Sequence, residues 1–189
     1  GYTSFDDPSL SHSYSDLDGN TTMAAIGADL AAKKGILVVI AAGNEGNKAW
    51  KYIMTPADAD SVLTVGAVNV SGIKGAFSSF GPTADGRVKP DVMSVGAPGI
   101  IASTGNGITA GPGTSYAAPK MAGLATCLWQ AFPEVNERSV REVFSKKLIT
   151  EAGTRGLVFK GDETTEGLPN EVLSYLESRF LIRTEKRGG

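Results

Sequence analysis

Residues 35–46 read Gly35-Ile-Leu-Val-Val-Ile-Ala-Ala-Gly-Asn-Glu-Gly46, which is a glycine, an apolar run and a glycine-rich loop. The run Ile36–Ile40 is apolar on both faces and mostly β-branched, which is typical of a parallel strand covered by helices on each side. In such sheets the loops at the carboxyl ends of the strands build the binding crevice. Asn44 follows the strand and therefore lies where a functional residue is expected.

The segment before this strand has the spacing of a helix. Asn20 or Thr21 can cap its start, and Gly35 ends it. Its apolar residues fall on one face, namely Met23, Ile26 and Leu30. Helix, glycine, strand and glycine-rich loop in this order indicate half of a βαβ unit, and hence an α/β domain.

The rest of the chain continues this pattern. Strands are predicted at residues 62–69, 91–98 and 100–103, and a hairpin turn at 105–107. Residues 114–132 are small and apolar on every side, which predicts a helix buried all round, with Pro119 tolerated because the first amides of a helix lack partners. Asn136 can cap a further helix with the apolar face Val140, Val143, Phe144 and Leu148. A last amphipathic helix is predicted around Val172, Leu173, Leu176 and Phe180.

Composition excludes several classes of function. The 189 residues carry a net charge of -2, and no basic stripe interleaved with aromatic residues occurs, so nucleic acid is not an expected partner. The longest apolar run, Gly35–Ala42, is far shorter than the ~20 residues that span a bilayer. No membrane association and no cofactor are expected. The single cysteine, Cys127, is expected to be a small core residue.

Ser115 is the candidate nucleophile. It follows two glycines, Gly111 and Gly113, and begins the predicted apolar helix, where free amides and the positive end of the helix dipole favour a developing negative charge. A serine needs a base to take its proton and donors to stabilise the oxyanion. The spacing alone is explained equally well by Thr114 and Ser115 serving as a helix cap.

A resemblance decides between these interpretations. The stretch Gly113-Thr-Ser-Tyr-Ala-Ala-Pro-Lys-Met-Ala-Gly123 resembles the nucleophile motif of the subtilisin family, Gly-Thr-Ser-x-Ala-x-Pro-x-x-Ala-Gly. Residues 35–46 are similar to the strand and loop that carry the family's oxyanion-hole asparagine. Two further stretches agree in kind and order, residues 61–68 and residues 77–99. The similarity extends over residues 20–148.

The resemblance implies a fold and a chemistry. The fold is the three-layer α/β subtilisin fold with a mostly parallel sheet, of which residues 1–148 would form the C-terminal portion and residues 149–189 a divergent extension. Ser115 would attack a peptide carbonyl, while its own amide and the Asn44 side chain hold the oxyanion. The substrate-binding residues implied are Ala42, Gly43, Gly113 and Thr114. The substrate would be a polypeptide, and the location extracytoplasmic or secreted.

The family's catalytic Asp and His both precede the oxyanion asparagine, and neither can be assigned here. His12 is the sole histidine, and its neighbours do not match the family's His-Gly-Thr helix start. Gly1 would be the last residue of the family's Ser-Leu-Gly strand. We therefore expect the chain to be nearly inert alone, and to need the missing N-terminal part of its own catalytic domain as a partner.

Three alternatives accompany this interpretation. Residues 16–20 faintly resemble a calcium loop, but they lack a full ligand series, so a helix-capping loop is favoured; a structural calcium ion is compatible with the resemblance, without an assigned metal site. A catalytically silent peptide-binding module would keep the same fold. A nucleotide-binding domain is disfavoured because residues 43–46 form neither a dinucleotide fingerprint nor a phosphate loop.

Overall fold

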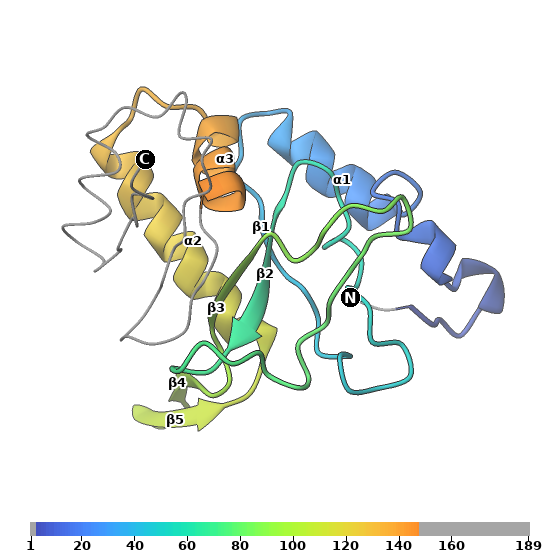
Figure 1. Ribbon diagram of the computed structural model, residues 1–189, viewed down its shortest axis with the longest axis horizontal. Coiled ribbons are helices and arrows are strands. Elements are labelled where there is room, and N and C mark those ends of the chain that lie inside the picture. Colours follow the sequence, from blue (N-terminus) through green and yellow to red (C-terminus); the bar gives the residue numbers. More distant parts are fainter. Residues whose placement is uncertain (1–2, 148–189) are drawn as a thin grey trace, which may run out of the picture.

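The computed structural model describes residues 3–147, whose helices and strands are shown in Figure 1. In chain order these are α1 Met23–Ala32, β1 Val39–Ala41, β2 Leu63–Val68, β3 Val92–Val95, β4 Gly99–Ser103, β5 Gly107–Gly111, α2 Thr114–Ala131 and α3 Glu137–Lys147. Two 3-10 turns, Pro8–Leu10 and Tyr14–Asp16, precede α1. The predicted tail helix and the boundary at residue 148 lie outside the described residues.

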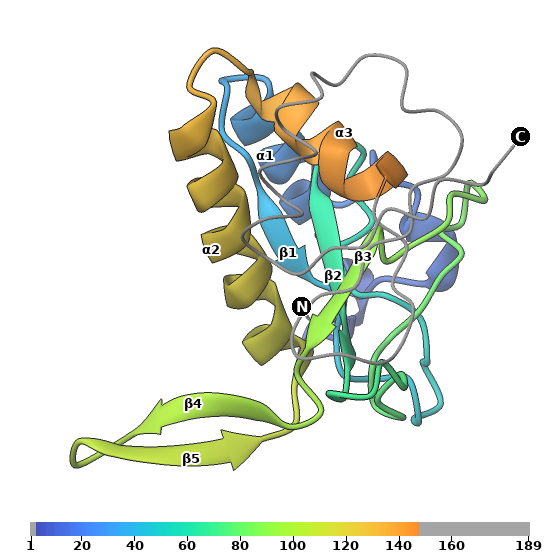
Figure 2. The same cartoon turned by 60° about the vertical axis from the view of Figure 1, so that its left-hand side comes forward.

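The central sheet is parallel and has the order β1-β2-β3. Val39 pairs with Leu63, and Val65 pairs with Val92. Every residue of β2 is buried, and α2 and α3 cover one face of the sheet while α1 lies on the other (Figures 1 and 2). The predicted three-layer α/β arrangement is confirmed. The first strand pairs only from Val39, later than the predicted Ile36, which is 55% exposed.

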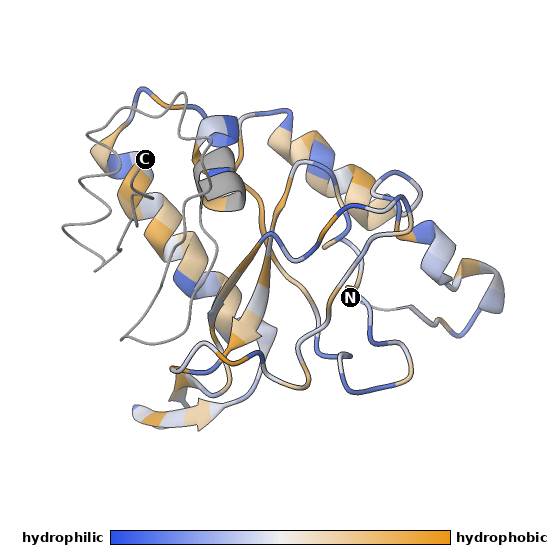
Figure 3. Cartoon of the chain, in the orientation of Figure 1, coloured by the Kyte–Doolittle hydropathy of each residue, from blue (hydrophilic) through white to orange (hydrophobic). Residues whose placement is uncertain are grey.

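The larger core lies between the sheet and the two C-terminal helices. Alternate residues of β2 face α2, and Val140 and Phe144 of α3 complete the cluster with both side chains fully buried. Asn136 caps α3 as predicted, since its Oδ1 accepts a hydrogen bond of 2.8 Å from the Ser139 amide. Figure 3 shows apolar colours along the sheet and hydrophilic colours over much of the segment before α1.

α1 lies on the opposite face of the sheet, where its small residues pack against Val38, Ile40 and Val62. Ala25 is fully buried against Val62, and the predicted apolar face is the exposed one: Met23, Ile26 and Leu30 are 85%, 39% and 54% exposed. The N-cap is Thr22, whose Oγ1 accepts from the Ala25 amide, and not Asn20 or Thr21. Periodicity identified the helix, whereas the side that packs on the sheet follows from the close approach that alanine allows.

Three predictions for α2 are wrong. The helix is not buried all round, because Gly123, Thr126 and Cys127 are exposed, and Cys127 is therefore not a core residue. Pro119 is the sixth residue of the helix, beyond the four amides that lack partners, so its missing N–H leaves the Ser115 carbonyl without its usual helical donor.

The predicted hairpin turn is confirmed. β4 and β5 pair antiparallel around Gly105–Gly107, where Gly105 and Asn106 have φ values of 82° and 62°. These are left-handed conformations that glycine and asparagine tolerate best. The hairpin projects from the rest of the fold beside the start of α2 (Figure 2).

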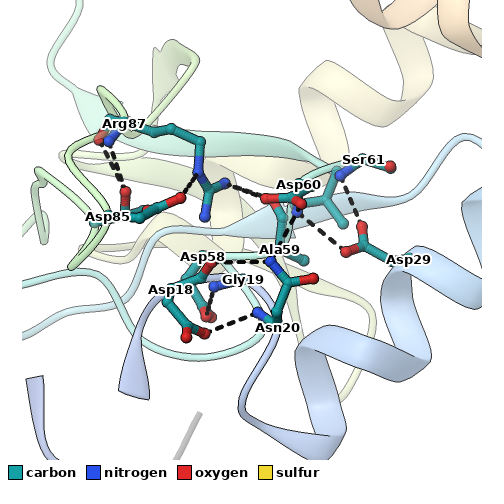
Figure 4. Close-up of polar contacts among 12 residues, drawn as sticks. Asp18, Gly19, Asn20, Asp29, Asp58, Ala59, Asp60, Ser61, Asp85 and Arg87 are labelled. Carbon is teal, nitrogen blue, oxygen red and sulfur yellow. Dashed lines mark hydrogen bonds and ion pairs between the residues drawn. The ribbon is translucent and has the colours of Figure 1, made fainter. Parts of the chain in front are cut away.

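A polar network ties three loops together next to α1 (Figure 4). Arg87 forms ion pairs with Asp60 at 3.0 Å and with Asp85 at 2.7 Å, and the Gly19 amide donates to Asp58 at 3.0 Å. Asp58 is fully buried, and this burial raises the pKa of its carboxyl above the usual value. Within residues 3–147, Asp58 Oδ1 and Arg87 Nη2 are buried atoms without a hydrogen-bond partner.

No helix in residues 3–147 is long and apolar enough to cross a bilayer.

Candidate active site

The two predicted catalytic residues come from neighbouring elements. Asn44 lies in the loop after the carboxyl end of β1, and Ser115 is the second residue of α2, which packs against β1. The Asn44 Oδ1 accepts two hydrogen bonds from Thr114, one from its amide at 2.9 Å and one from its hydroxyl at 3.1 Å. The structure thus joins the Asn44 side chain directly to the residue before Ser115.

Thr114 is the centre of this connection. It is fully buried, and its hydroxyl accepts a bond of 3.2 Å from the Gly43 amide while donating to Asn44. A hydroxyl can accept and donate at once, which a valine of the same shape could not do. The loop after β1 is therefore fixed to the first turn of α2 by both backbone and side chain.

These contacts fix which way the Asn44 carboxamide is turned. The Thr114 amide can only donate, so the atom that faces it must be the carboxamide oxygen. The amino group then occupies the other branch, and within the described residues no protein atom accepts a hydrogen bond from it. Asn44 therefore has two N–H donors available near the start of α2.

Ser115 itself is exposed, in the first turn of α2. Gly113 precedes the helix in an extended conformation with φ 170°, and its amide donates to the Gly96 carbonyl at 2.8 Å. The Thr114 amide donates to Asn44 and the Tyr116 amide donates to the Gly113 carbonyl at 3.1 Å, whereas the Ser115 amide donates to no acceptor among the described residues. The serine hydroxyl is thus accessible at the positive end of an 18-residue helix.

Ser79 positions the Asn44 loop and was not singled out from the sequence. Its side chain is fully buried, its hydroxyl accepts from the Glu45 amide at 2.9 Å, and its amide donates to the Gly43 carbonyl at 3.0 Å. Both residues that flank Asn44 are therefore held by one serine. The signal available was the Phe77-Ser-Ser-Phe-Gly81 stretch, whose small polar residues lie between aromatic ones.

The structure places Gly43 and Ala42 at the base of the loop. Gly43 has φ 111°, and a Cβ there would lie 2.9 Å from the Met54 side chain, so only glycine fits. The methyl group of Ala42 is fully buried in a core cluster with Leu17 and Ile53. Its backbone is also engaged, because the Ala42 amide donates to the Val65 carbonyl at 2.9 Å and its carbonyl accepts from the Met54 amide at 3.1 Å.

His12 lies in the N-terminal loop. Its amide donates to the Thr3 carbonyl at 2.8 Å, and its ring packs edge-on against Phe5 with centroids 5.6 Å apart. Among the hydrogen bonds of residues 3–147, none joins His12 to Ser115. In the described part of the chain, the sole histidine is therefore not in contact with Ser115 or Asn44.

Hydrogen bonds within the loop at residues 16–20 fix the segment that leads into α1. Asp18 Oδ1 accepts from the amides of Asn20 and Thr21 at 2.9 and 2.8 Å, and Asp18 Oδ2 accepts from the Thr21 hydroxyl. These bonds lower the pKa of Asp18, the bond from the Asn20 amide most of all. In residues 3–147, no group of three or more His, Cys, Asp or Glu side chains is arranged to hold a metal ion.

This chain is similar in sequence to a known protein family and to several of its members. The Subtilase family, peptidase family S8, matches residues 6–170. Subtilisin NAT of Bacillus subtilis subsp. natto is 38% identical over 128 residues, which make up 66% of this chain and 31% of the relative. The thermostable alkaline protease of Halalkalibacterium halodurans is 32% identical over 127 residues, or 66% of this chain and 32% of the relative.

Solved structures of proteases are also similar to the structure of this chain. The self-cleaved protease domain of PatA is similar with a TM-score of 0.52 at 29% identity, over 63% of this chain and 43% of that one. The prenylagaramide maturation protease PagA, at 23% identity and a TM-score of 0.53 over 67% of this chain and 45% of that one, shows a likeness of fold alone. The chain spans about a third of the length of the curated relatives it matches. Because the family match extends over most of its residues, this chain belongs to the subtilase family.

Proposed function

We propose that this chain is the C-terminal part of the catalytic domain of a serine endopeptidase, with Ser115 as nucleophile and Asn44 as oxyanion donor. The observation that carries the proposal is the double hydrogen bond from Thr114 to Asn44 Oδ1, which holds Asn44 against the residue before Ser115 and leaves its carboxamide N–H groups without an acceptor among the described residues. Family membership supports serine peptidase chemistry in general.

The proposed reaction proceeds through an acyl-enzyme. The Ser115 oxygen attacks the scissile carbonyl carbon while a histidine base takes the hydroxyl proton, and the carbonyl oxygen becomes an oxyanion. The Asn44 carboxamide and the Ser115 amide donate hydrogen bonds to it. The protonated base then gives the proton to the leaving amine, and water hydrolyses the ester by the same steps. Gly113 would flank the site as backbone, and the buried Thr114 would position Asn44.

An upstream part of the same catalytic domain is the proposed partner, since it would supply the catalytic Asp and His. Three surfaces of the described residues support this proposal. β1 forms one edge of the described three-stranded sheet, the outer face of α1 exposes Met23 and Leu30, and α2 exposes Gly123 and Cys127. A parallel strand with its helices would pair with that edge and cover these helix faces. Without it, a serine that lacks its base keeps little activity.

Labelling of Ser115 with a fluorophosphonate tests the proposal. The isolated chain should label slowly, and the chain co-produced with the upstream segment should label quickly and cleave a peptide ester, with Ser115→Ala abolishing both. Rapid labelling of the isolated chain would show that the base lies within it. If the reconstituted protein binds peptides without forming an acyl-enzyme, the catalytically silent binding module is the correct function.

The extracytoplasmic location is likewise a proposal that rests on family membership alone.

A further inference from the structure

A cavity of about 200 Å³ lies at the edge of the sheet opposite the proposed active site. Its lining comes from the C-terminal end of α1, from the segments that lead into β1 and β2, and from the first turns of α3. These are the amino ends of the strands, whereas Asn44 follows the carboxyl end of β1. The cavity is therefore a separate feature that the proposed peptidase chemistry does not use.

The charges around this cavity are predominantly positive. Three cationic side chains line it, Lys33, Arg138 and Arg141, against one carboxylate, Glu137. Glu137 stands in the first turn of α3, where the helix dipole already stabilises its charge. Lys33 and Arg141 alone outnumber Glu137, so a small anionic group that enters the cavity would meet more cations than carboxylates.

Arg141 is the best-placed of these cations. It is half-buried, and its Nη1 donates a hydrogen bond of 3.2 Å to the Asp60 carbonyl, which orients the guanidinium. A guanidinium has five N–H donors, and within the described residues this is the single hydrogen bond that Arg141 makes. The remaining donors are held in a planar fork, which matches the two oxygens of a carboxylate.

The size and floor of the cavity indicate what the anion is attached to. The volume is below the ~300–1,000 Å³ of pockets for drug-sized ligands, so it suits one side chain rather than a cofactor. Ile36 and Leu37 form an apolar part of the lining. Such a surface packs against methylene groups, which an acidic amino-acid side chain has and an inorganic anion lacks.

We propose that this cavity binds the carboxylate side chain of an acidic peptide segment, at a site separate from Ser115. The guanidinium of Arg141 and the ammonium of Lys33 hold the carboxylate, while the aliphatic part of the ligand packs on Ile36 and Leu37. The site goes beyond the proposed hydrolysis, and its occupation can be measured without any bond being cleaved.

The test is calorimetric titration of the 189-residue chain with a blocked tetrapeptide, acetyl-Ala-Glu-Glu-Ala-amide, beside its glutamine counterpart and inorganic phosphate. The glutamate peptide should bind and the glutamine peptide should not, with weaker binding at higher salt. Arg141→Gln and Lys33→Gln should each reduce affinity roughly tenfold, the cost of one charge-assisted hydrogen bond. Lys34→Gln removes a charge next to the site without lining it, and should leave the affinity unchanged.

Several outcomes would overturn the proposal. Binding of phosphate without binding of the peptide would make this an inorganic-anion site, and equal losses in the Lys33 and Lys34 variants would reduce it to general surface charge. Absence of binding by every probe would remove the site altogether. Lys33 is exposed, so its variant keeps the test valid if loss of the Arg141 contact to Asp60 destabilises the fold. Because the readout is binding, failure here leaves the proposed peptidase function untouched.

Discussion

Thr114 holds the Asn44 carboxamide oxygen with two hydrogen bonds, from its amide at 2.9 Å and from its hydroxyl at 3.1 Å. The same hydroxyl accepts from the Gly43 amide. One buried side chain therefore links the loop after β1 to the first turn of α2, and the orientation of the proposed oxyanion donor depends on it.

Thr114→Val should separate these contributions. The variant keeps the hydrogen bond from its backbone amide to Asn44 but loses the hydroxyl. The Gly43 amide is then left without its acceptor. A buried unsatisfied donor costs about 1–3 kcal/mol of unfolding free energy. We also expect kcat of the reconstituted enzyme to fall by about tenfold, because the carboxamide is held less firmly. Thr114→Ser retains the hydroxyl and should recover most of both quantities in urea unfolding and peptide-ester assays. Equal activity of the two variants would show that the hydroxyl does not position Asn44.

Asn44→Ala should lower kcat and leave KM nearly unchanged. An oxyanion donor acts in the transition state, where the negative charge develops, and not on the bound substrate. The expected loss is about 10²–10³-fold, a magnitude measured for a subtilisin and carried over to this chain. Steady-state kinetics of the reconstituted protein provide the measurement. A rise in KM at constant kcat would instead make Asn44 a substrate-binding residue.

Ser79→Ala should loosen the loop that carries Asn44. The variant leaves the Glu45 amide without its acceptor, at a cost of about 1–3 kcal/mol in unfolding free energy. The loss of kcat should exceed any change in KM, because only the position of the oxyanion donor is affected. Ser103→Ala, at a hairpin serine whose hydroxyl bonds only the neighbouring Thr104 carbonyl among the described residues, serves as the control with no comparable effect.

Local periodicity predicted the elements of this fold well, because helices and strands are set by neighbouring residues. Residues 114–132 and the Asn136-capped segment are helices at nearly the expected positions, and the turn at 105–107 is present. The buried face of each helix was less predictable from the sequence. Which side of α1 or α2 is buried depends on partners distant in the sequence, so the exposure of Met23 and Cys127 could not be inferred from spacing.

The candidate site also has a part that the sequence predicted and a part that it did not. The motif around Ser115 and the loop around Asn44 could be recognised from contiguous residues. The hydrogen bond that joins Thr114 to Asn44 spans 70 positions, and that from Glu45 to Ser79 spans 34. Such pairings follow from the packing of α2 on the sheet, and a single sequence contains no periodic signal for them.

Asp58 should make stability depend on pH. Burial is the largest influence on its carboxyl and raises the pKa, against hydrogen bonds from the Gly19 amide and from Thr55 that lower it. A carboxyl with a raised pKa in the folded state stabilises the fold when protonated, and this contribution is lost as the pH rises through the folded pKa. Asp58→Asn, which cannot ionise, should therefore gain stability relative to the parent chain as the pH rises above about 4, the ordinary pKa of an aspartate.

Asp85→Asn is the control of opposite sign. The hydrogen bond from Arg87 is the main cause that lowers the pKa of Asp85, so its carboxylate stabilises the fold at neutral pH and loses this contribution as the pH falls. Urea unfolding of the parent and both variants across the range gives the differences. A pH-independent difference between Asp58→Asn and the parent would show that Asp58 keeps one protonation state throughout.

Leu30→Glu tests whether the outer face of α1 is covered by the upstream part of the catalytic domain. Leu30 is 54% exposed in the described fold, so the substitution should change the unfolding free energy of the isolated chain by no more than about 0.5 kcal/mol. If the upstream segment packs on this face, the new carboxylate becomes buried without a partner, and reconstitution should weaken sharply. Ile73→Glu is the matched control, because Ile73 is 65% exposed in a turn after β2, away from α1. The rate of fluorophosphonate labelling, measured as a function of the concentration of the upstream segment, reports the reconstitution of both variants. Equal reconstitution of the two variants would place the upstream segment elsewhere, since a buried apolar contact cannot accept an unpaired charge without cost.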